Sequence, residues 1–354
     1  MSYRTLTART WRENIPFSAL IELTYRCNLD CFFCYNDLGL QGVPLSADQY
    51  VSLFEDLRDL GTMNLTLSGG EPLAHRDFFV LGRKARELGF AVRVKSNGHA
   101  LGGERARRVR DEIDPFVIEI SLHGARAETH DRQTRVAGSF GRLMRNLDDM
   151  RALGLRLKIN STLTRWNEDE VGAMLDLADA LGIPIQFGPE VSPRDNGAED
   201  TLAIAPSREG VKRLLALLRA RAQQPAPPMQ LDEAATPTPR ADPGRHCGAG
   251  SGSVTVDPFG NVFPCVQWRR LAGNLHHQSI AAIWSGSPEL ARVRDLTAGA
   301  VRDFVQGLGP HGTAVGFCPA LAEQRTGSAL QLAPDIRQRL DVLRELDDGA
   351  HDSR

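Results

Sequence analysis

The sequence predicts an α/β protein in which helices cover a mostly parallel sheet that forms an open sheet or a partial barrel. Two patterns in the 354-residue chain support this fold class. From about residue 18 to 190, short apolar runs rich in β-branched residues alternate with longer amphipathic stretches. A glycine ends several of the amphipathic stretches shortly before the next run. Because crossovers between parallel strands are right-handed, six such units give one sheet with its helices outside.

Each expected strand is a short apolar run that follows a turn or a helix end. The six strands are expected at residues 19–23, 64–68, 91–95, 116–121, 156–161 and 184–188. Capping boxes predict two helix starts, at Ser46 with Gln49 and at Asn167 with Glu170. Left-handed glycine caps predict four helix ends, at Gly61, Gly89, Gly154 and Gly182.

The remainder of the chain predicts a second, smaller domain. We expect the barrel over residues 1–223, with a last helix near 211–221, a proline-rich linker over 224–245 and a C-terminal domain over 246–354. In that domain, residues 253–257 and 261–264 alternate around a turn and predict a hairpin. Short helices are expected at 280–284, at 289–296 after Ser287 and Pro288, and at 335–346.

Composition and charge exclude several classes of protein. The 42 basic and 44 acidic residues give a net charge of −2, which argues against nucleic acids or a membrane surface as partners. Residues 1–20 are polar and show no signal-peptide pattern, and no run of 18 apolar residues predicts a membrane span. A cytoplasmic location is therefore expected. In a reducing compartment, clustered cysteines bind metal or react more often than they form disulfides.

Three of the six cysteines form a tight cluster directly after the first expected strand. Cys27, Cys31 and Cys34 have the spacing C-x3-C-x2-C, and the next cysteine is Cys247. In a barrel, the loop after a strand lies at the face where active sites are built. Three thiolates can hold three corners of an iron–sulfur cubane and leave one iron open. A zinc site is the weaker interpretation, because zinc favours paired cysteines and four ligands.

This cysteine loop resembles that of the radical S-adenosylmethionine (SAM) superfamily. Phe33 is the aromatic residue before the last cysteine, and Gly69-Gly70-Glu71-Pro72 after the second strand is similar to the family's GGEP motif. The resemblance implies a partial (βα)6 barrel of the TIM type. It also implies that Cys27, Cys31 and Cys34 hold a 4Fe-4S cluster that binds SAM. One electron from the cluster then cleaves SAM to methionine and a 5′-deoxyadenosyl radical, which takes a hydrogen atom from the substrate.

The resemblance also implies residues that bind SAM. Adjacent glycines at 69 and 70 allow close approach of a ligand, and Glu71 could accept bonds from its ammonium group. The polar residues at the ends of later strands would contact the ribose and carboxylate, namely Asn97, Ser121 and Asn160. Arg135, in a loop similar to SAM-proximal loops, could pair with the SAM carboxylate.

The C-terminal cysteines resemble a SPASM or twitch extension, which binds auxiliary iron–sulfur clusters. Cys247, Cys265 and Cys318 replace the seven cysteines of a full SPASM domain, and they imply one auxiliary 4Fe-4S cluster. Its fourth position would hold a non-cysteine ligand such as His246 or His311, a substrate atom or nothing. If all six cysteines bind clusters, no thiol remains to return a hydrogen atom. Cys318 is either a cluster ligand or a hydrogen donor. The first role implies an oxidative reaction, and the second implies a thiol-dependent one.

The resemblance favours an enzyme that oxidatively modifies a peptide, in particular a ribosomally made one. The barrel begins close to Met1, so a separate precursor-recognition protein is expected, together with an electron donor of the flavodoxin or ferredoxin type. A first alternative is a twitch dehydrogenase or epimerase acting on a small molecule such as an aminocyclitol or sugar. Substrate contacts could lie at Arg194, Asp195 and Asn196, although residues of this kind after a strand are more often solvated loop residues. A second is a non-catalytic iron–sulfur protein, against which the GGEP-like loop counts.

Overall fold

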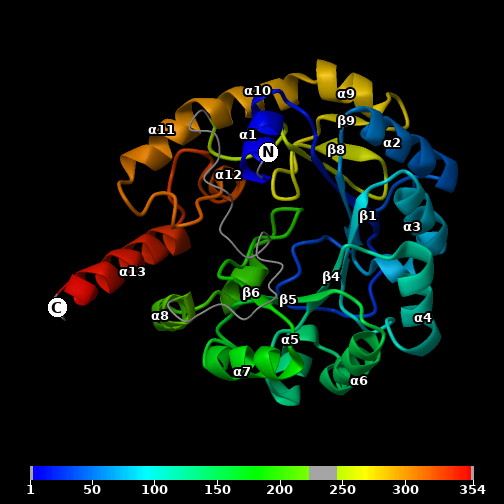
Figure 1. Cartoon of the computed structure of the whole chain (residues 1–354). Helices are drawn as coiled ribbons and strands as arrows, with labels where there is room; N and C mark the ends of the chain where they lie inside the picture. Colours follow the sequence, from blue (N-terminus) through cyan, green and yellow to red (C-terminus); the bar gives the residue numbers. More distant parts are fainter. Residues whose placement is uncertain (1–2, 223–244, 352–354) are drawn as a thin grey trace.

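The structure is a computed structural model that describes residues 3–222 and 245–351 (Figure 1). Its centre is a parallel sheet whose first six strands follow chain order from β1 to β6. These strands are β1 Ser18–Thr24, β2 Asn64–Gly69, β3 Ala91–Ser96, β4 Val117–Ser121, β5 Leu157–Thr162 and β6 Ile185–Gly188. Each pairs in parallel with its neighbour, so the partial (βα)6 barrel expected from the sequence is confirmed.

Helices lie on the outside of these strands, and several of them bury apolar side chains in the common core. They are α1 Tyr3–Arg12, α2 Ala47–Asp59, α3 Phe78–Glu87, α4 Gly103–Arg108 with a π-helical continuation at Val109–Ile113, α5 Ala127–Thr134, α6 Ser139–Ala152, α7 Val171–Leu181 and α8 Arg208–Ala222. Short 3-10 turns lie at Pro72–Ala74 and Asp200–Ile204. Many fully buried side chains in this core are aliphatic, including Ile21, Leu67 and Ile118.

The C-terminal hairpin extends the barrel sheet, which the sequence did not predict. β7 Ser253–Val256 pairs in parallel with β1, with Ser18 opposite Ser253 and Ile21 opposite Val256. β8 Asn261–Phe263 returns antiparallel to β7, as expected, and β9 Gly273–Asn274 pairs with β8. The sheet therefore has nine strands in the order β6-β5-β4-β3-β2-β1-β7-β8-β9.

Several C-terminal helices follow the hairpin, and the first three of them form a continuous row along the top of Figure 1. These C-terminal helices are α9 Ile280–Gly286, α10 Pro288–Ala298, α11 Ala300–Gly307, α12 Pro319–Thr326 and α13 Pro334–His351. α13 packs against α8 of the barrel, where Arg219 forms an ion pair of 2.7 Å with Asp347. At the other end of the chain, Trp11 on α1 covers Gly248 and Gly252, at which a Cβ would lie only 2.7 and 2.2 Å from the indole.

Most of the local predictions are confirmed, and one is wrong. The box of Ser46 and Gln49 caps α2, and all four predicted glycines have positive φ after a helix. Asn167 and Glu170 do not form a capping box. Instead, the Asn167 side chain accepts from Thr164 N within a preceding turn, while the Glu170 carboxylate accepts from Ala125 N at 2.8 Å. Asn167 thus bonds within its own turn and Glu170 bonds to a distant loop, so neither side chain caps α7.

Three helices, α1, α11 and α12, were not expected from the sequence. The expected linker at 224–245 falls almost wholly outside the described residues. Within the described ranges, no helix is both long and apolar enough to cross a membrane.

Candidate active site

A cavity of about 490 Å³ opens at the carboxyl ends of the barrel strands. Side chains and backbone from β1 to β6 and their following loops line it, and they include most of the residues singled out in the sequence. Those lining residues are Cys27, Cys31, Phe33, Cys34, Gly69, Gly70, Asn97, Ser121 and Asn160. Parallel strands bring their carboxyl ends to one edge, so residues far apart in the chain meet there.

The cysteine loop after β1 is held by hydrogen bonds from several neighbouring elements. Asp30 N and Phe32 N donate to carbonyls at the end of α5, at 3.1 and 3.0 Å. The Asn36 side chain donates to Gly69 O at 3.1 Å, and the Arg194 guanidinium donates to Cys34 O at 3.1 Å. The loop therefore has a fixed backbone that presents three thiols to one cavity.

The three thiols are buried close together. Burial raises the pKa of each thiol, that of Cys34 to about 11, and mutual repulsion adds to the effect at Cys31 and Cys34. In residues 3–222 and 245–351, no three Cys, His, Asp or Glu side chains converge on a point that would hold one metal ion. Buried thiols that are near one another without meeting at a point fit the corners of a multi-iron cluster, whose positive iron would stabilise the thiolates.

The glycine pair is required by backbone packing. Gly69 has φ of +122°, and a Cβ there would lie 2.3 Å from Thr24 O. A Cβ on Gly70 would lie 2.6 Å from Arg26 O. Both glycines line the cavity, so the chain after β2 lies directly against the start of the cysteine loop and leaves backbone exposed to a ligand.

Glu71 does not line the cavity, in contrast to its expected contact with the SAM ammonium. Its carboxylate is 2% exposed and accepts bonds from Ser96 Oγ at 2.9 Å, Asn97 N at 2.9 Å and Leu73 N at 3.2 Å. Burial raises its pKa to about 7 despite these donors. The geometry makes Glu71 a positioning residue for Asn97, while Pro72 starts the 3-10 turn beyond it.

Asn97 connects the end of β3 to the cysteine loop. Its side-chain amide nitrogen donates to Asn28 Oδ1 at 2.9 Å and to Cys27 Sγ at 3.7 Å.

Phe33 and Asn160 also have partners at the cavity. The Phe33 ring packs 4.5 Å from the ring of His123, which also lines the cavity. Asn160 donates to Glu119 Oε2 at 2.6 Å.

Glu119 and Lys95 also line the cavity, although the sequence did not predict them there. Arg93 and Lys95 lie 2.9 and 3.4 Å from the Glu119 carboxylate, whose side chain is 7% exposed. Burial opposes the charge of Glu119, but these cations and Asn160 lower its pKa to about 2. The alternation of residues along β3 and β4 is the signal that could have revealed Lys95 and Glu119. Charged residues at every second position of a buried strand must face a polar interior.

Four residues considered as SAM or substrate contacts do not line the cavity. Arg135 pairs with Asp30 at 3.2 Å, stacks over Phe32 and does not line the cavity. The segment 194–196 binds the cysteine loop, since Arg194 contacts Cys34 O, Asp195 N donates to Tyr35 O and the Asn196 amide donates to Asp37. These side chains position the loop.

The three C-terminal cysteines form a second buried group. Cys247, Cys265 and Cys318 pack around a small apolar cluster that contains Trp268, Val293 and Ala320. Burial raises the pKa of all three thiols, that of Cys247 to about 12, and repulsion from Cys265 adds at Cys247 and Cys318. Like the first set, this donor group fits a multi-iron cluster.

The histidines named as fourth ligands already have partners. His246 Nε2 lies 2.9 Å from Phe317 O, and His311 Nδ1 lies 3.5 Å from Asp347 on α13. Gln267, two residues after Cys265, lines the cavity of the first cysteine set. The two cysteine groups are therefore joined by a short loop.

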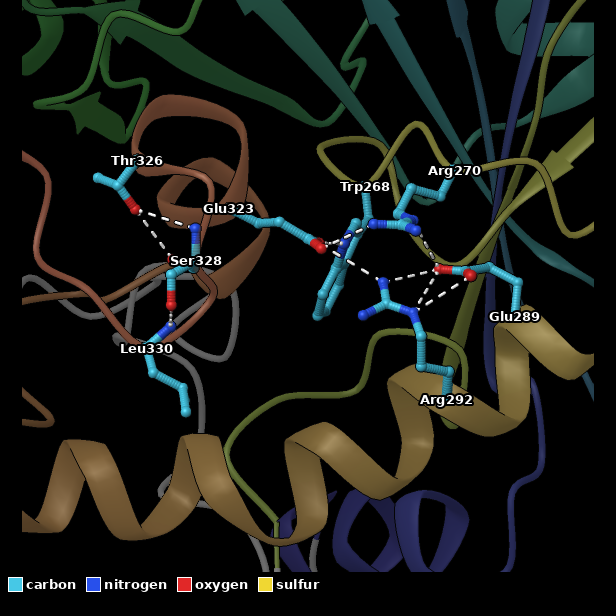
Figure 2. Close-up of polar contacts among 8 residues, drawn as sticks. All are labelled: Trp268, Arg270, Glu289, Arg292, Glu323, Thr326, Ser328 and Leu330. Atoms are coloured by element: carbon cyan, nitrogen blue, oxygen red, sulfur yellow. Dashed lines mark hydrogen bonds and ion pairs between the residues drawn. The ribbon is translucent and has the colours of Figure 1, made fainter.

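An ionic network surrounds Trp268, which belongs to the apolar cluster that packs against the second group (Figure 2). The Trp268 indole donates to the Glu323 carboxylate on α12, the helix that starts directly after Cys318. Arg270 forms ion pairs with both Glu323, at 2.8 Å, and Glu289, at 3.3 Å. Arg292 on α10 pairs with Glu289 at 2.8 Å. The network fixes the loop after Cys265 to the helix after Cys318.

Barrel, cysteine loop and second cysteine group together define an iron–sulfur enzyme of the SAM-cleaving class, and comparison with known proteins agrees. A model of the radical SAM superfamily matches residues 21–178, and a model of the SPASM iron–sulfur cluster-binding domain matches residues 247–304. The chain belongs to the radical SAM superfamily and carries a C-terminal SPASM domain. Cys318 lies beyond the SPASM match.

Curated relatives and solved structures are similar over most of the chain. The PqqA peptide cyclase of Ruegeria pomeroyi is 30% identical over 257 residues, which cover 71% of this chain and 67% of the cyclase. The AdoMet-dependent heme synthase of Methanosarcina barkeri is 28% identical over 309 residues, covering 80% and 86%. The structure of anSMEcpe with bound AdoMet and Cp18Cys peptide has a TM-score of 0.69, 14% identity and coverage of 95% and 99%. The protein is thus a SAM-dependent enzyme with iron–sulfur cofactors.

Proposed function

We propose that this enzyme oxidatively modifies a peptide substrate in the cavity at the carboxyl ends of β1–β6. The observation that carries the proposal is the second buried cysteine group, which is joined to the cavity through Gln267. A group of this kind can accept the electron that an oxidation releases. The peptide cyclase named among the relatives and the peptide bound in anSMEcpe favour a peptide over a small molecule.

Cys27, Cys31 and Cys34 would hold the cluster that binds SAM, and Cys247, Cys265 and Cys318 an auxiliary one. When bound, the first cluster supplies the electron that cleaves SAM to methionine and a 5′-deoxyadenosyl radical, which takes a hydrogen atom from the substrate. Asn97, Ser121 and Asn160 would orient SAM, together with the backbone of Gly69 and Gly70. Phe33 would shield the cysteine loop from water.

Two partners and a location complete the proposal. A flavodoxin- or ferredoxin-type protein would donate the electron, and a separate recognition protein would present the precursor peptide. None of the six cysteines, all of which lie in the described residues, forms a disulfide, which suits the reducing cytoplasm.

Anaerobic reconstitution tests the cluster assignment. We expect about eight iron atoms per chain, as two four-iron clusters. The Cys318→Ala variant should lose the auxiliary cluster and keep the SAM-binding one, as judged by iron content and electron paramagnetic resonance (EPR). If the variant binds both clusters, Cys318 is not a ligand, and a thiol-dependent reaction replaces the oxidative one.

Turnover tests the reaction. With SAM and dithionite, the enzyme should form 5′-deoxyadenosine and methionine. Short peptides encoded beside the gene are the substrates to try, and an oxidative cross-link removes two hydrogen atoms, which mass spectrometry detects. A peptide that gains no modification while a sugar or aminocyclitol is oxidised would contradict the peptide proposal.

A further inference from the structure

A row of charged side chains crosses the barrel below the residues assigned to SAM. Lys95 on β3, Glu119 on β4 and Lys158 on β5 lie side by side, since Lys95 is opposite Glu119 and Glu119 is opposite Lys158 in the strand register. Each lies two residues before one of the cavity-lining residues at the strand ends, which are Asn97, Ser121 and Asn160. Residues two apart share a face of a strand, so this charged row lies about 6–7 Å deeper in the barrel.

Cations outnumber carboxylates in and around the charged row. Both oxygens of Glu119 already have partners, because Arg93 donates to Oε1 at 2.9 Å and the Asn160 amide donates to Oε2 at 2.6 Å. Lys95 Nζ lies 3.4 Å from the same Oε2. Burial lowers the pKa of Lys158, and repulsion from Arg93 and Lys95 adds to this effect while Glu119 opposes it. Three cations therefore share one carboxylate.

Two other buried acidic residues near the cavity are held by partners of their own. Glu190 lines the cavity just after β6 and pairs with Arg339 on α13. Glu71 accepts a hydrogen bond from Ser96 Oγ at 2.9 Å. Adjacent residues of a strand point to opposite faces, so Ser96 and Glu71 lie on the other side of β3 from the Lys95 side chain. Neither acid offsets the positive charge of the row.

Lys95 is the cation that a ligand can reach. Its side chain is 44% exposed and lines the cavity, whereas Arg93 and Lys158 lie behind the lining residues. A lysine ammonium is a compact point charge with three donors on a flexible stem. An anionic group that enters the cavity would compensate the excess positive charge and find its donor in Lys95.

We propose that Lys95 determines substrate specificity by binding a carboxylate of the peptide, in a layer of the barrel below SAM. The inference rests on the proposed function, because it takes the ligand of the cavity to be a peptide, and it narrows that peptide to one that presents an acidic group. The carboxylate belongs to an acidic side chain or to the C-terminus, which share the same chemistry. Bound at Lys95, it would hold the adjoining part of the peptide beside the strand ends where SAM is cleaved.

Binding of short peptides to the reconstituted, SAM-loaded holoenzyme tests the inference. The probes are acetyl-Gly-Glu-Gly-amide, the neutral acetyl-Gly-Gln-Gly-amide, and acetyl-Gly-Gln-Gly with a free C-terminal carboxylate. Anaerobic isothermal titration calorimetry without a reductant measures their affinities. At least one carboxylate probe should bind about fivefold or more tightly than the neutral one, and the probe that does so identifies the source of the carboxylate.

Variants assign this preference to Lys95. In Lys95→Met the preference should vanish, while SAM binding by equilibrium dialysis should stay within about twofold of the wild type. Lys95→Arg keeps the charge and should keep the preference, and it serves as the second variant if Lys95→Met fails to fold. Lys84→Met is the matched control, because Lys84 lies on α3 and pairs with Glu55 at 2.7 Å, and it should bind the probes as the wild type does.

Three results would overturn the inference. They are equal or absent binding of all three probes, a preference that survives in Lys95→Met, and a loss of SAM binding in Lys95→Met with the preference unchanged. The last result would assign Lys95 to the SAM carboxylate. Because no reductant is present, these outcomes do not depend on turnover. An enzyme that distinguishes the probes but oxidises no peptide would contradict the proposed function alone.

Discussion

Glu119 provides a quantitative test of the electrostatics inside the barrel. Its carboxylate accepts bonds from Arg93 and Asn160 and lies 3.4 Å from Lys95. Burial opposes ionisation, but the two cations and the amide lower the pKa from 4.5 to about 2. One pKa unit corresponds to about 1.4 kcal/mol, so ionised Glu119 stabilises the folded state by about 3 kcal/mol.

The sign of the pH dependence follows from the lowered pKa. The unfolded chain binds a proton at Glu119 below pH 4.5, whereas the folded chain does so only below about pH 2. The stabilisation is therefore fully present above pH 4.5 and is lost as the pH falls through 2. In Glu119→Gln we expect a loss of about 3 kcal/mol at pH 7 and a smaller loss at pH 3.5.

Denaturant unfolding of the metal-free, reduced protein measures both quantities, with circular dichroism as the signal. Glu13→Gln is the control, because Glu13 forms an exposed pair with Arg9 on the protein surface, which contributes at most about 0.5 kcal/mol. The reasoning is refuted if Glu119→Gln is as stable as the wild type at pH 7, or if its deficit does not shrink in acid.

Three further predictions concern the loops around the cavity. Gly70→Ala places a Cβ 2.6 Å from Arg26 O, so iron incorporation should fall and stability should drop by about 1–3 kcal/mol, whereas Gly172→Ala, with nothing within 4 Å, should stabilise α7 by up to about 1 kcal/mol. Glu323→Gln weakens the acceptor of the Trp268 indole and both arginine pairs, and should destabilise the protein by about 1–3 kcal/mol in calorimetry while leaving the SAM-binding cluster's EPR signal intact. Asn97→Ala should weaken SAM binding roughly five- to tenfold by equilibrium dialysis, whereas Arg135→Ala should change it less than twofold, and the reverse order would contradict the lining of the cavity.

Much of the barrel and its cysteine loop could be predicted because the signals are local. Alternating apolar runs fix the six strands, and the spacing of Cys27, Cys31 and Cys34 requires only one short loop. The orientation of single side chains could not be predicted in this way. Glu71 follows a cavity-lining glycine, yet its carboxylate turns toward the end of β3, because two backbone amides and a hydroxyl offer it donors there. Arg135 likewise turns away from the cavity and forms an ion pair with Asp30 on the surface.

The relation between the two cysteine groups depends on contacts that no local pattern encodes. Six strands leave a barrel open between β1 and β6, and the C-terminal segment contacts both edges. On the β1 side, β7 pairs with β1 and Arg269 pairs with Glu22. On the β6 side, Gln324 on α12 donates to Arg194 O at 3.1 Å, and Arg339 on α13 pairs with Glu190, which lines the cavity just after β6. The C-terminal segment is therefore held at both open edges of the barrel, β1 and β6. These contacts also fix the second cysteine group beside the cavity, which is the arrangement that an internal electron acceptor requires.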